Sequence, residues 1–137
     1  MPHPIVDKIA QGYRILADFS GSMASQQSAT VEACKKAGTS ESVICFGDSV
    51  KECKVSKLAR MRADGQTAGW EAVEVAMQKG WKEIMIVSDL EFNKKSFEET
   101  QISGKFQKII VVTPTSFDRG VFDSLKTITD EIEVVSL

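Results

Sequence analysis

Short apolar runs alternate with stretches of helical periodicity along most of the chain, and this alternation limits the folds that the chain can adopt. Runs typical of buried strands span residues 13–19, 42–46, 83–88, 108–113 and 131–136. Apolar residues recur at helical spacing over residues 23–37, 67–79 and 116–128, which predicts three helices, and shorter helices are expected at 56–61 and after Ser96. Strands that are separated by helices need crossover connections, so we expect a mostly parallel sheet.

A direct turn adds one antiparallel strand to this pattern. Gly47-Asp48 joins the run at 42–46 to a polar, Lys-rich run at 50–55. Two strands joined by so short a turn form a hairpin, and exposed lysines are typical of an edge strand. The sequence therefore predicts an α/β fold of three layers: a Rossmann-like open sheet that is mostly parallel, with one antiparallel edge strand and helices on both faces.

Length and charge restrict the class of protein. The chain has 137 residues, and we expect an N-terminal segment at 1–12 followed by a single domain at 13–137. With 17 Lys and Arg against 19 Asp and Glu, the net charge of −2 provides no overall positive field for nucleic acid or an anionic membrane. The only histidine is His3, which excludes catalytic triads and metal sites built on several histidines.

The first residues and the cysteines favour a cytoplasmic protein. The start of the chain carries neither the basic region nor the apolar run of a signal peptide, and the longest apolar stretch, 109–112, is too short to cross a bilayer. The three cysteines, Cys34, Cys45 and Cys53, match no zinc-binding spacing. We expect reduced, mostly packed thiols, with a redox pair of Cys45 and Cys53 across the hairpin as the alternative.

Carboxylate and hydroxyl side chains follow the first strand directly. Asp18, Ser20 and Ser22 stand two residues apart, so an extended backbone directs them to the same side. In an open parallel sheet, ligands bind beyond the carboxyl ends of the strands, at the point where the strand order reverses. We therefore expect these three side chains to face one small volume at the binding edge of the sheet.

This D-x-S-x-S pattern, together with two later motifs, resembles the von Willebrand factor A (VWA) family, whose members are three-layer α/β domains with a metal-ion-dependent adhesion site. The family's Thr after a Gly-rich loop, at the start of a helix, matches Thr67 in ADGQTAGWEAVEVAM. Its Asp at the end of the fourth strand matches Asp89 in IMIVSDLEF. The resemblance covers about residue 13 to the end, and it implies that Asp18, Ser20, Ser22, Thr67 and Asp89 hold a divalent cation.

Two residues depart from the family pattern. The family usually has a second Gly before the Thr, where this chain has Gln66, and a Gly after the Asp, where this chain has Leu90. Neither change removes a metal-binding oxygen. We expect both to alter the shape of their loops and therefore the choice of partner.

The donor set by itself favours a hard cation. Carboxylates and hydroxyls suit Mg²⁺, with Mn²⁺ or Ca²⁺ as alternatives, and two carboxylates balance the charge of one such ion. Water or an outside ligand completes an octahedral shell, and the resemblance implies that this ligand is an Asp or Glu of a partner protein. The same residues have other interpretations: Ser20, Ser22 or Thr67 can cap the helices that follow, and Asp18 and Asp89 can order loops without an ion.

A basic stretch leads from the edge strand toward Thr67. It contains Lys51, Lys54, Lys57, Arg60 and Arg62. Such a run is typical of a solvated edge; the alternative is a rim that steers an acidic partner or RNA toward the metal, with Lys57, Arg60 and Arg62 as candidate partner-binding residues. Trp70 lies within one helical turn of Thr67 and is a further candidate, with core packing as the alternative.

An enzyme is the less favoured function. An Asp after the first strand of an α/β fold is also the nucleophile of haloacid-dehalogenase-like phosphatases, but their second carboxylate, two residues later, is replaced by Ser20. Phosphate-loop, G-x-S-x-G and H-E-x-x-H motifs are absent. The sequence therefore predicts a non-enzymatic module that binds a partner protein, with an AAA+ ATPase or another assembly as candidates. An RNA-contacting accessory domain is the alternative, and no membrane contact is expected.

Overall fold

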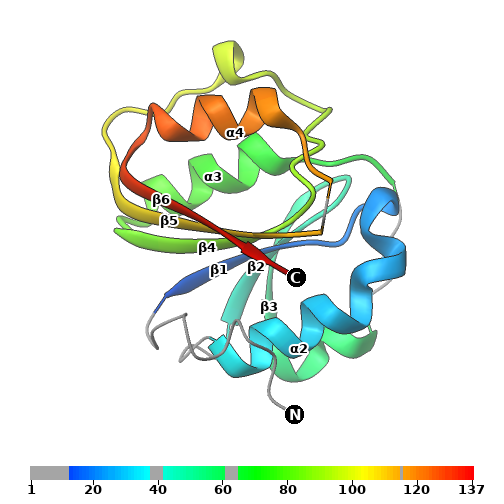
Figure 1. Ribbon diagram of the computed structural model, residues 1–137. Helices are drawn as coiled ribbons and strands as arrows, with labels where there is room; N and C mark the ends of the chain where they lie inside the picture. The colour runs from blue at the N-terminus through cyan, green and yellow to red at the C-terminus, as the bar shows by residue number, and fades with distance from the viewer. Residues whose placement is uncertain (1–12, 38–41, 61–64, 115) are drawn as a thin grey trace.

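One mixed sheet with helices on both sides forms the molecule that the computed structural model describes, over residues 13–37, 42–60, 65–114 and 116–137 (Figure 1). Its strands are β1 (Arg14–Asp18), β2 (Ser42–Phe46), β3 (Val50–Lys54), β4 (Glu83–Val87), β5 (Phe106–Thr113) and β6 (Thr129–Ser136). The strand order is β3-β2-β1-β4-β5-β6, and every neighbouring pair is parallel except β2 and β3. This confirms the predicted fold class. The predicted N-terminal segment, 1–12, lies outside the described residues.

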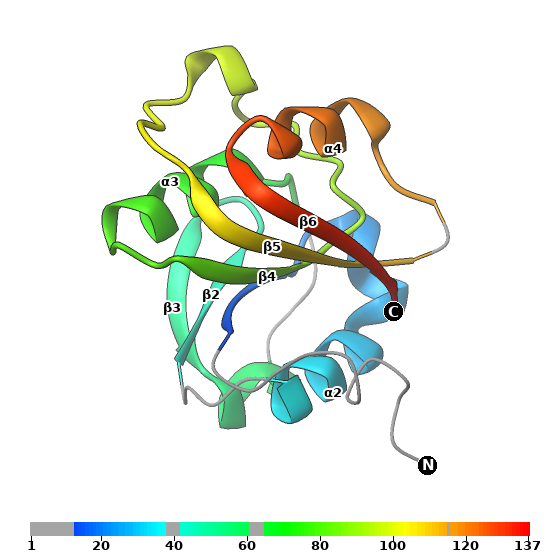
Figure 2. The ribbon, with the colours of Figure 1, turned by 60° about the vertical axis from the view of Figure 1, so that its left-hand side comes forward.

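Helices cover both faces of the sheet. The α-helix α2 (Gln27–Ala37) and the 3₁₀ helix η2 (Val55–Arg60) pack on one face, and α3 (Gly69–Gln78) and α4 (Arg119–Lys126) pack on the other (Figures 1 and 2). Side chains of a strand alternate between the two faces, so Ile15 and Ala17 pack under α2 whereas Leu16 packs under α3. Because both faces of the central strands are buried, these strands are continuous apolar runs in the sequence.

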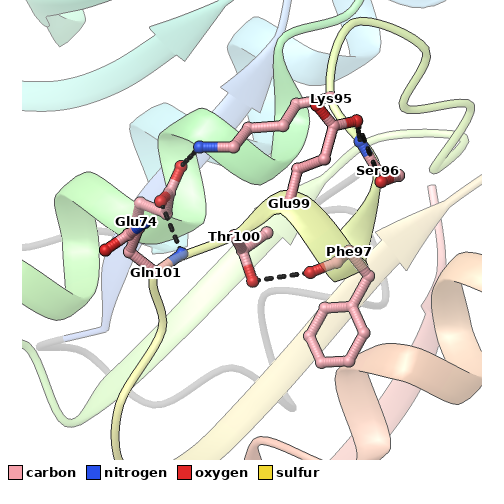
Figure 3. A network of polar contacts seen from close by, with 7 residues as sticks. All are labelled: Glu74, Lys95, Ser96, Phe97, Glu99, Thr100 and Gln101. Carbon is pink, nitrogen blue, oxygen red and sulfur yellow. Dashed lines mark hydrogen bonds and ion pairs between the residues drawn. The ribbon is translucent and has the colours of Figure 1, made fainter.

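Helix boundaries differ from the prediction where local hydrogen bonds decide them. The helix expected at 23–37 begins as a 3₁₀ helix, η1 (Gly21–Gln26), and continues as α2. The helix expected at 116–128 is limited at its start by Asp118, whose carboxylate accepts the N–H of Val121 at 3.0 Å. The short helix after Ser96 is confirmed as η3 (Phe97–Glu99), where the N–H and the hydroxyl of Ser96 donate to Glu99 (Figure 3). None of the helices in the described ranges has the length and apolar character of a membrane span.

The strand order reverses between β1 and β4. From β1 the chain crosses through α2 to β2 on one side, whereas from β4 it continues to β5 on the other side. The carboxyl ends of β1 and β4 therefore lie next to each other, at the place where open α/β sheets bind ligands. Asp18 is the last residue of β1, and Asp89 is the second residue after β4.

Candidate metal centre

Asp18 lies at the centre of the polar contacts beyond the strand ends. Its side chain is 1% exposed. The carboxylate oxygen Oδ1 accepts hydrogen bonds from the N–H of Ser20 at 2.8 Å and from the hydroxyl of Ser20 at 2.5 Å. The other oxygen, Oδ2, accepts a hydrogen bond from the hydroxyl of Ser88 at 2.6 Å. Because a carboxylate oxygen has two lone pairs, Oδ2 keeps one for a cation or for a water bound to a cation.

The burial of Asp18 works against its negative charge. Burial raises the pKa of this carboxyl above its ordinary value of 3.8, hydrogen bonds from Ser20 and Ser88 lower the pKa, and the neighbouring Asp89 carboxylate raises it again. Burial is the largest of these effects. A cation beside Asp18 would favour the charged form and compensate for the loss of water.

The hydroxyls of Ser20 and Ser22 lie together, with their oxygens 3.2 Å apart. Metal–oxygen distances place neighbouring ligands of an octahedral ion about 3 Å apart for Mg²⁺ and about 3.4 Å apart for Ca²⁺, so this separation fits either ion. Ser20 is buried and Ser22 is exposed. Ser20 stands at the cap position of η1, but its side chain makes no cap hydrogen bond, and its hydroxyl donates to Asp18. Helix capping therefore does not explain this serine.

Asp89 adds a second carboxylate from the neighbouring strand. Its side chain is largely buried, and its Oδ1 accepts the N–H of Glu91 at 3.2 Å. The pKa of Glu91 is raised, first by a side-chain hydrogen bond with Asp89 and by repulsion from it, and then by burial and by the carboxylates of Asp118 and Asp18. Negative charge is therefore concentrated at this end of the sheet, which favours the approach of a cation.

Thr67 joins the group through the backbone of its loop. Its N–H donates to Oδ1 of Asn93 at 2.8 Å, and its carbonyl accepts the N–H of Asn93 at 3.1 Å. The carbonyl of Gly65 accepts the N–H of Gly21 at 3.0 Å. The helix α3 begins after Ala68, so Thr67 is not the cap residue that the alternative interpretation requires. All five candidate ligands thus come from three loops that are hydrogen-bonded to one another.

The two departures from the family pattern take different forms in the backbone. Gln66 is exposed, and its N–H donates to Oδ1 of Asp48 at 2.7 Å. The preceding Gly65 has a φ of +78°, and a Cβ there would clash with the Asp48 carboxylate, so this position needs glycine. Leu90 has a φ of 62° although it is not glycine, and its side chain is fully buried.

An open pocket of about 460 Å³ lies beside Ser22 and Asp89, beyond the carboxyl ends of β1, β4 and β5. It is lined by Ser22, Ser25, Gln26, Asp89, Glu91, Pro114, Ser116, Phe117 and Asp118. Asp18, Ser20 and Thr67, by contrast, are buried. An outside ligand can therefore approach the candidate site from the side of Ser22 and Asp89.

Trp70 is a packing residue in this structure. Its side chain is 2% exposed, and its ring centroid lies 5.4 Å from that of Phe92 and 4.9 Å from that of Phe97. It therefore has no surface to offer a partner, and the core-packing alternative explains it.

The basic stretch runs away from the candidate ligands: Lys51 pairs with Cys45 near the carboxyl end of β2, but the residues after it lie farther along β3 and in η2. Lys54, at the end of β3, pairs with Ser42 at the amino end of β2, whereas Asp18 pairs with Phe46 at the carboxyl end of β2. The helix η2, which contains the exposed Lys57, therefore begins at the amino end of β2, whereas Asp18 lies level with the carboxyl end of β2. Lys57 does not line the pocket beside Ser22 and Asp89, so the steering role stays an alternative to a solvated edge. The side chain of Arg60 and the whole of Arg62 lie outside the described part of the chain.

Ser88 and Asn93 hydrogen-bond to candidate ligands, but the sequence did not indicate either residue as part of the site. Ser88 directly precedes Asp89, but it reads as the last residue of an apolar strand. Asn93 follows in a polar loop without any periodic or motif signal. Their contacts span 70 residues to Asp18 and 26 residues to Thr67, so only the folded chain reveals them.

The donor set limits the kind of ion that fits. Among the described residues, no group of three or more His, Cys, Asp or Glu side chains could hold a metal ion. The candidate site has two carboxylates, so hydroxyls and water must supply the other oxygens, which suits a hard cation such as Mg²⁺. Comparisons with protein-family models, with curated proteins and with solved structures find no match for this chain.

Proposed function

We propose that this chain is a non-enzymatic protein-binding module that holds a divalent cation, Mg²⁺ before Mn²⁺ or Ca²⁺, at Asp18, Ser20, Ser22, Thr67 and Asp89. One observation carries the proposal: three loops that bear these oxygen donors are hydrogen-bonded to one another where the strand order reverses. The resemblance to VWA domains rests on the same residues and supports the same function.

The partner would supply a carboxylate to the cation. Mg²⁺ takes six oxygen ligands, and the chain offers five groups, so at least one position remains for water or an outside oxygen. Ser22 and Asp89 line the open pocket, so that position would face it. Two carboxylates balance the charge of a divalent ion, and the ion keeps affinity for one further anion. An Asp or Glu side chain of another protein fits this requirement.

Turnover of a phosphate ester fits the site poorly. Asp18 is buried, so the phosphorus of an outside substrate would not reach its carboxylate oxygens. Ser20 occupies the place of the acid/base carboxylate, and its hydroxyl donates to Asp18. Binding is therefore the function that the side chains support best.

Calorimetric titration with Mg²⁺ tests the metal site. We expect the wild-type chain to bind Mg²⁺ and Asp89→Asn to weaken the binding at least tenfold, because the site loses one of two charged ligands. Asp118→Asn is the matched control. It changes a carboxylate of the same pocket, and its remaining oxygen can still accept the Val121 N–H.

Capture of a partner tests the binding function. Immobilised chain should retain a partner from a cell extract in Mg²⁺ but not in EDTA, and Asp18→Ala should abolish capture in both. Circular dichroism should confirm that Asp18→Ala remains folded. Capture that persists both in EDTA and in the variant would contradict a metal-bridged mechanism.

A further inference from the structure

The segment 88–93 contacts both of the other loops of the candidate site. It follows β4 and carries Asp89. At its start, Ser88 bonds to Asp18, and at its end, Asn93 bonds to Thr67. Two candidate ligands from distant parts of the chain are thus held by the segment that carries a third.

Ser88 fixes the position of the Asp18 carboxylate. The Ser88 side chain is fully buried, and its hydroxyl accepts the N–H of Leu90 at 2.8 Å. A hydroxyl has a single proton, and here it is donated to Oδ2 of Asp18 at 2.6 Å. The Leu90 N–H therefore orients the Ser88 hydroxyl, and the hydroxyl orients the carboxylate.

Asn93 fixes Thr67 from both sides. Its amide oxygen accepts the Thr67 N–H at 2.8 Å, and its own N–H donates to the Thr67 carbonyl at 3.1 Å. The N–H and the carbonyl of Thr67 are therefore both hydrogen-bonded to Asn93. These two bonds fix the backbone of Thr67 and with it the direction of the Thr67 side chain. Asn93 itself is exposed, so these bonds, rather than packing, are its contribution.

Both ends of the segment are anchored to regular structure. At the start, the Ser88 N–H donates to the Val112 carbonyl of β5 at 3.0 Å. Just after Asn93, Lys95 forms an ion pair with Glu74 of α3 at 2.9 Å, and the same carboxylate accepts the N–H of Gln101 at 2.8 Å (Figure 3). The segment between these anchors is therefore held well enough to orient the loops that it contacts.

We propose that Ser88 and Asn93 are positioning residues of the cation site: they hold Asp18 and Thr67 in place relative to Asp89. This inference rests on the proposed function, because it concerns the geometry of the same ligands. Outer groups that orient ligands typically change metal affinity by about 10- to 100-fold when they are removed. Loss of either side chain should therefore weaken the binding of the cation, although no metal ligand is removed.

Asn93→Ala tests the clamp on Thr67. We expect Mg²⁺ affinity measured by calorimetry on the folded protein to fall by about 10- to 100-fold, while circular dichroism stays close to that of wild type. The urea midpoint should fall as well, because the buried Thr67 N–H loses its acceptor. Gln107→Ala is the matched control, since it truncates another exposed amide side chain. A merely structural role of Asn93 would leave the Mg²⁺ affinity of the folded fraction unchanged.

Ser88 supplies a second, rescuable test. Ser88→Ala should weaken the binding of Mg²⁺. Ser88→Thr, which keeps the hydroxyl, should bind Mg²⁺ with an affinity close to that of wild type. If Ser88→Ala fails to fold, the Mg²⁺ affinity of Asn93→Ala alone tests the positioning role. Wild-type protein that takes up no Mg²⁺ overturns the metal site, and the positioning role falls with it. Wild type that binds Mg²⁺ while Asn93→Ala and Gln107→Ala bind equally well overturns only the positioning role.

Discussion

Asp18 carries a charge that the described protein groups leave only partly compensated. Hydrogen bonds from Ser20 and Ser88 stabilise the carboxylate, but burial outweighs them and raises the pKa above 3.8. A native carboxyl with a raised pKa binds its proton more tightly than the unfolded chain does. Its contribution to stability is therefore present at low pH and is lost as the pH rises through the native pKa.

Asp18→Asn isolates this effect because Asn does not ionise. In metal-free buffer, the free energy of unfolding of the variant relative to wild type should increase as the pH rises above about 4. Mg²⁺ at about 100 times its Kd should add about 2.7 kcal/mol to the wild type and clearly less to the variant. Urea unfolding measures both quantities. A stability difference that does not change with pH would contradict the assignment of a raised pKa.

At the scale of elements, the segment after β4 is held in a backbone conformation that suits glycine. Leu90 has a φ of 62°, a left-handed conformation that costs a non-glycine residue about 1–2 kcal/mol. Its side chain is fully buried among the apolar residues under α3 and α4, which stabilises the fold by about 1.5–3 kcal/mol. Packing therefore keeps leucine at a position where the backbone favours glycine.

This balance predicts an unusual order of variants at position 90. Leu90→Ala loses the packing and keeps the backbone strain, so it should lose about 2–5 kcal/mol. Leu90→Gly loses the same packing, but glycine adopts the left-handed conformation without strain. It should therefore be more stable than Leu90→Ala by about 0.5–1 kcal/mol. Urea unfolding of the three proteins checks the order. A glycine variant less stable than the alanine variant would show that strain at Leu90 is negligible.

At the scale of the whole molecule, the three cysteines belong to the apolar layer between the sheet and α2. Cys34 and Cys45 are buried and Cys53 is half-buried. Cys45 pairs with Lys51, and Cys53 pairs with Val43, so the two cysteines of the hairpin are diagonal neighbours. All three thiols are free, and a side-chain hydrogen bond joins Cys45 and Cys53 across the hairpin, so the redox pair stays a prediction.

Thiol reactivity should follow this burial. Burial raises the pKa of Cys34 to about 12 and raises that of Cys45 further, and the thiolate is the reactive form. In the native protein, an aromatic disulfide reagent should modify Cys53 first, and it should reach the other two thiols only after unfolding. Cys53→Ser should abolish the rapid phase. Rapid modification of Cys34 or Cys45 in the native protein would contradict the packing of this layer.

The sequence determined the layers of the fold and the three motifs of the candidate site. Continuous apolar runs and helical stripes are local patterns, so they predict strands, helices and the crossovers between them. Asp18, Ser20 and Ser22 are neighbours in the chain, and a rule of open sheets places them at the binding edge. These inferences needed only local spacing and general topology, whereas Thr67 and Asp89 were added by the resemblance to the VWA family.

Only the tertiary structure decided which residues hold the site together. Ser88 and Asn93 bond to groups 70 and 26 residues away, and Leu90 keeps its conformation because distant apolar side chains surround it. The same folding buries Trp70 and separates Lys57 from the pocket, although both lie near Thr67 in the chain. The physical reason is that hydrogen-bond partners and burial depend on the packing of remote segments, which local sequence patterns do not encode.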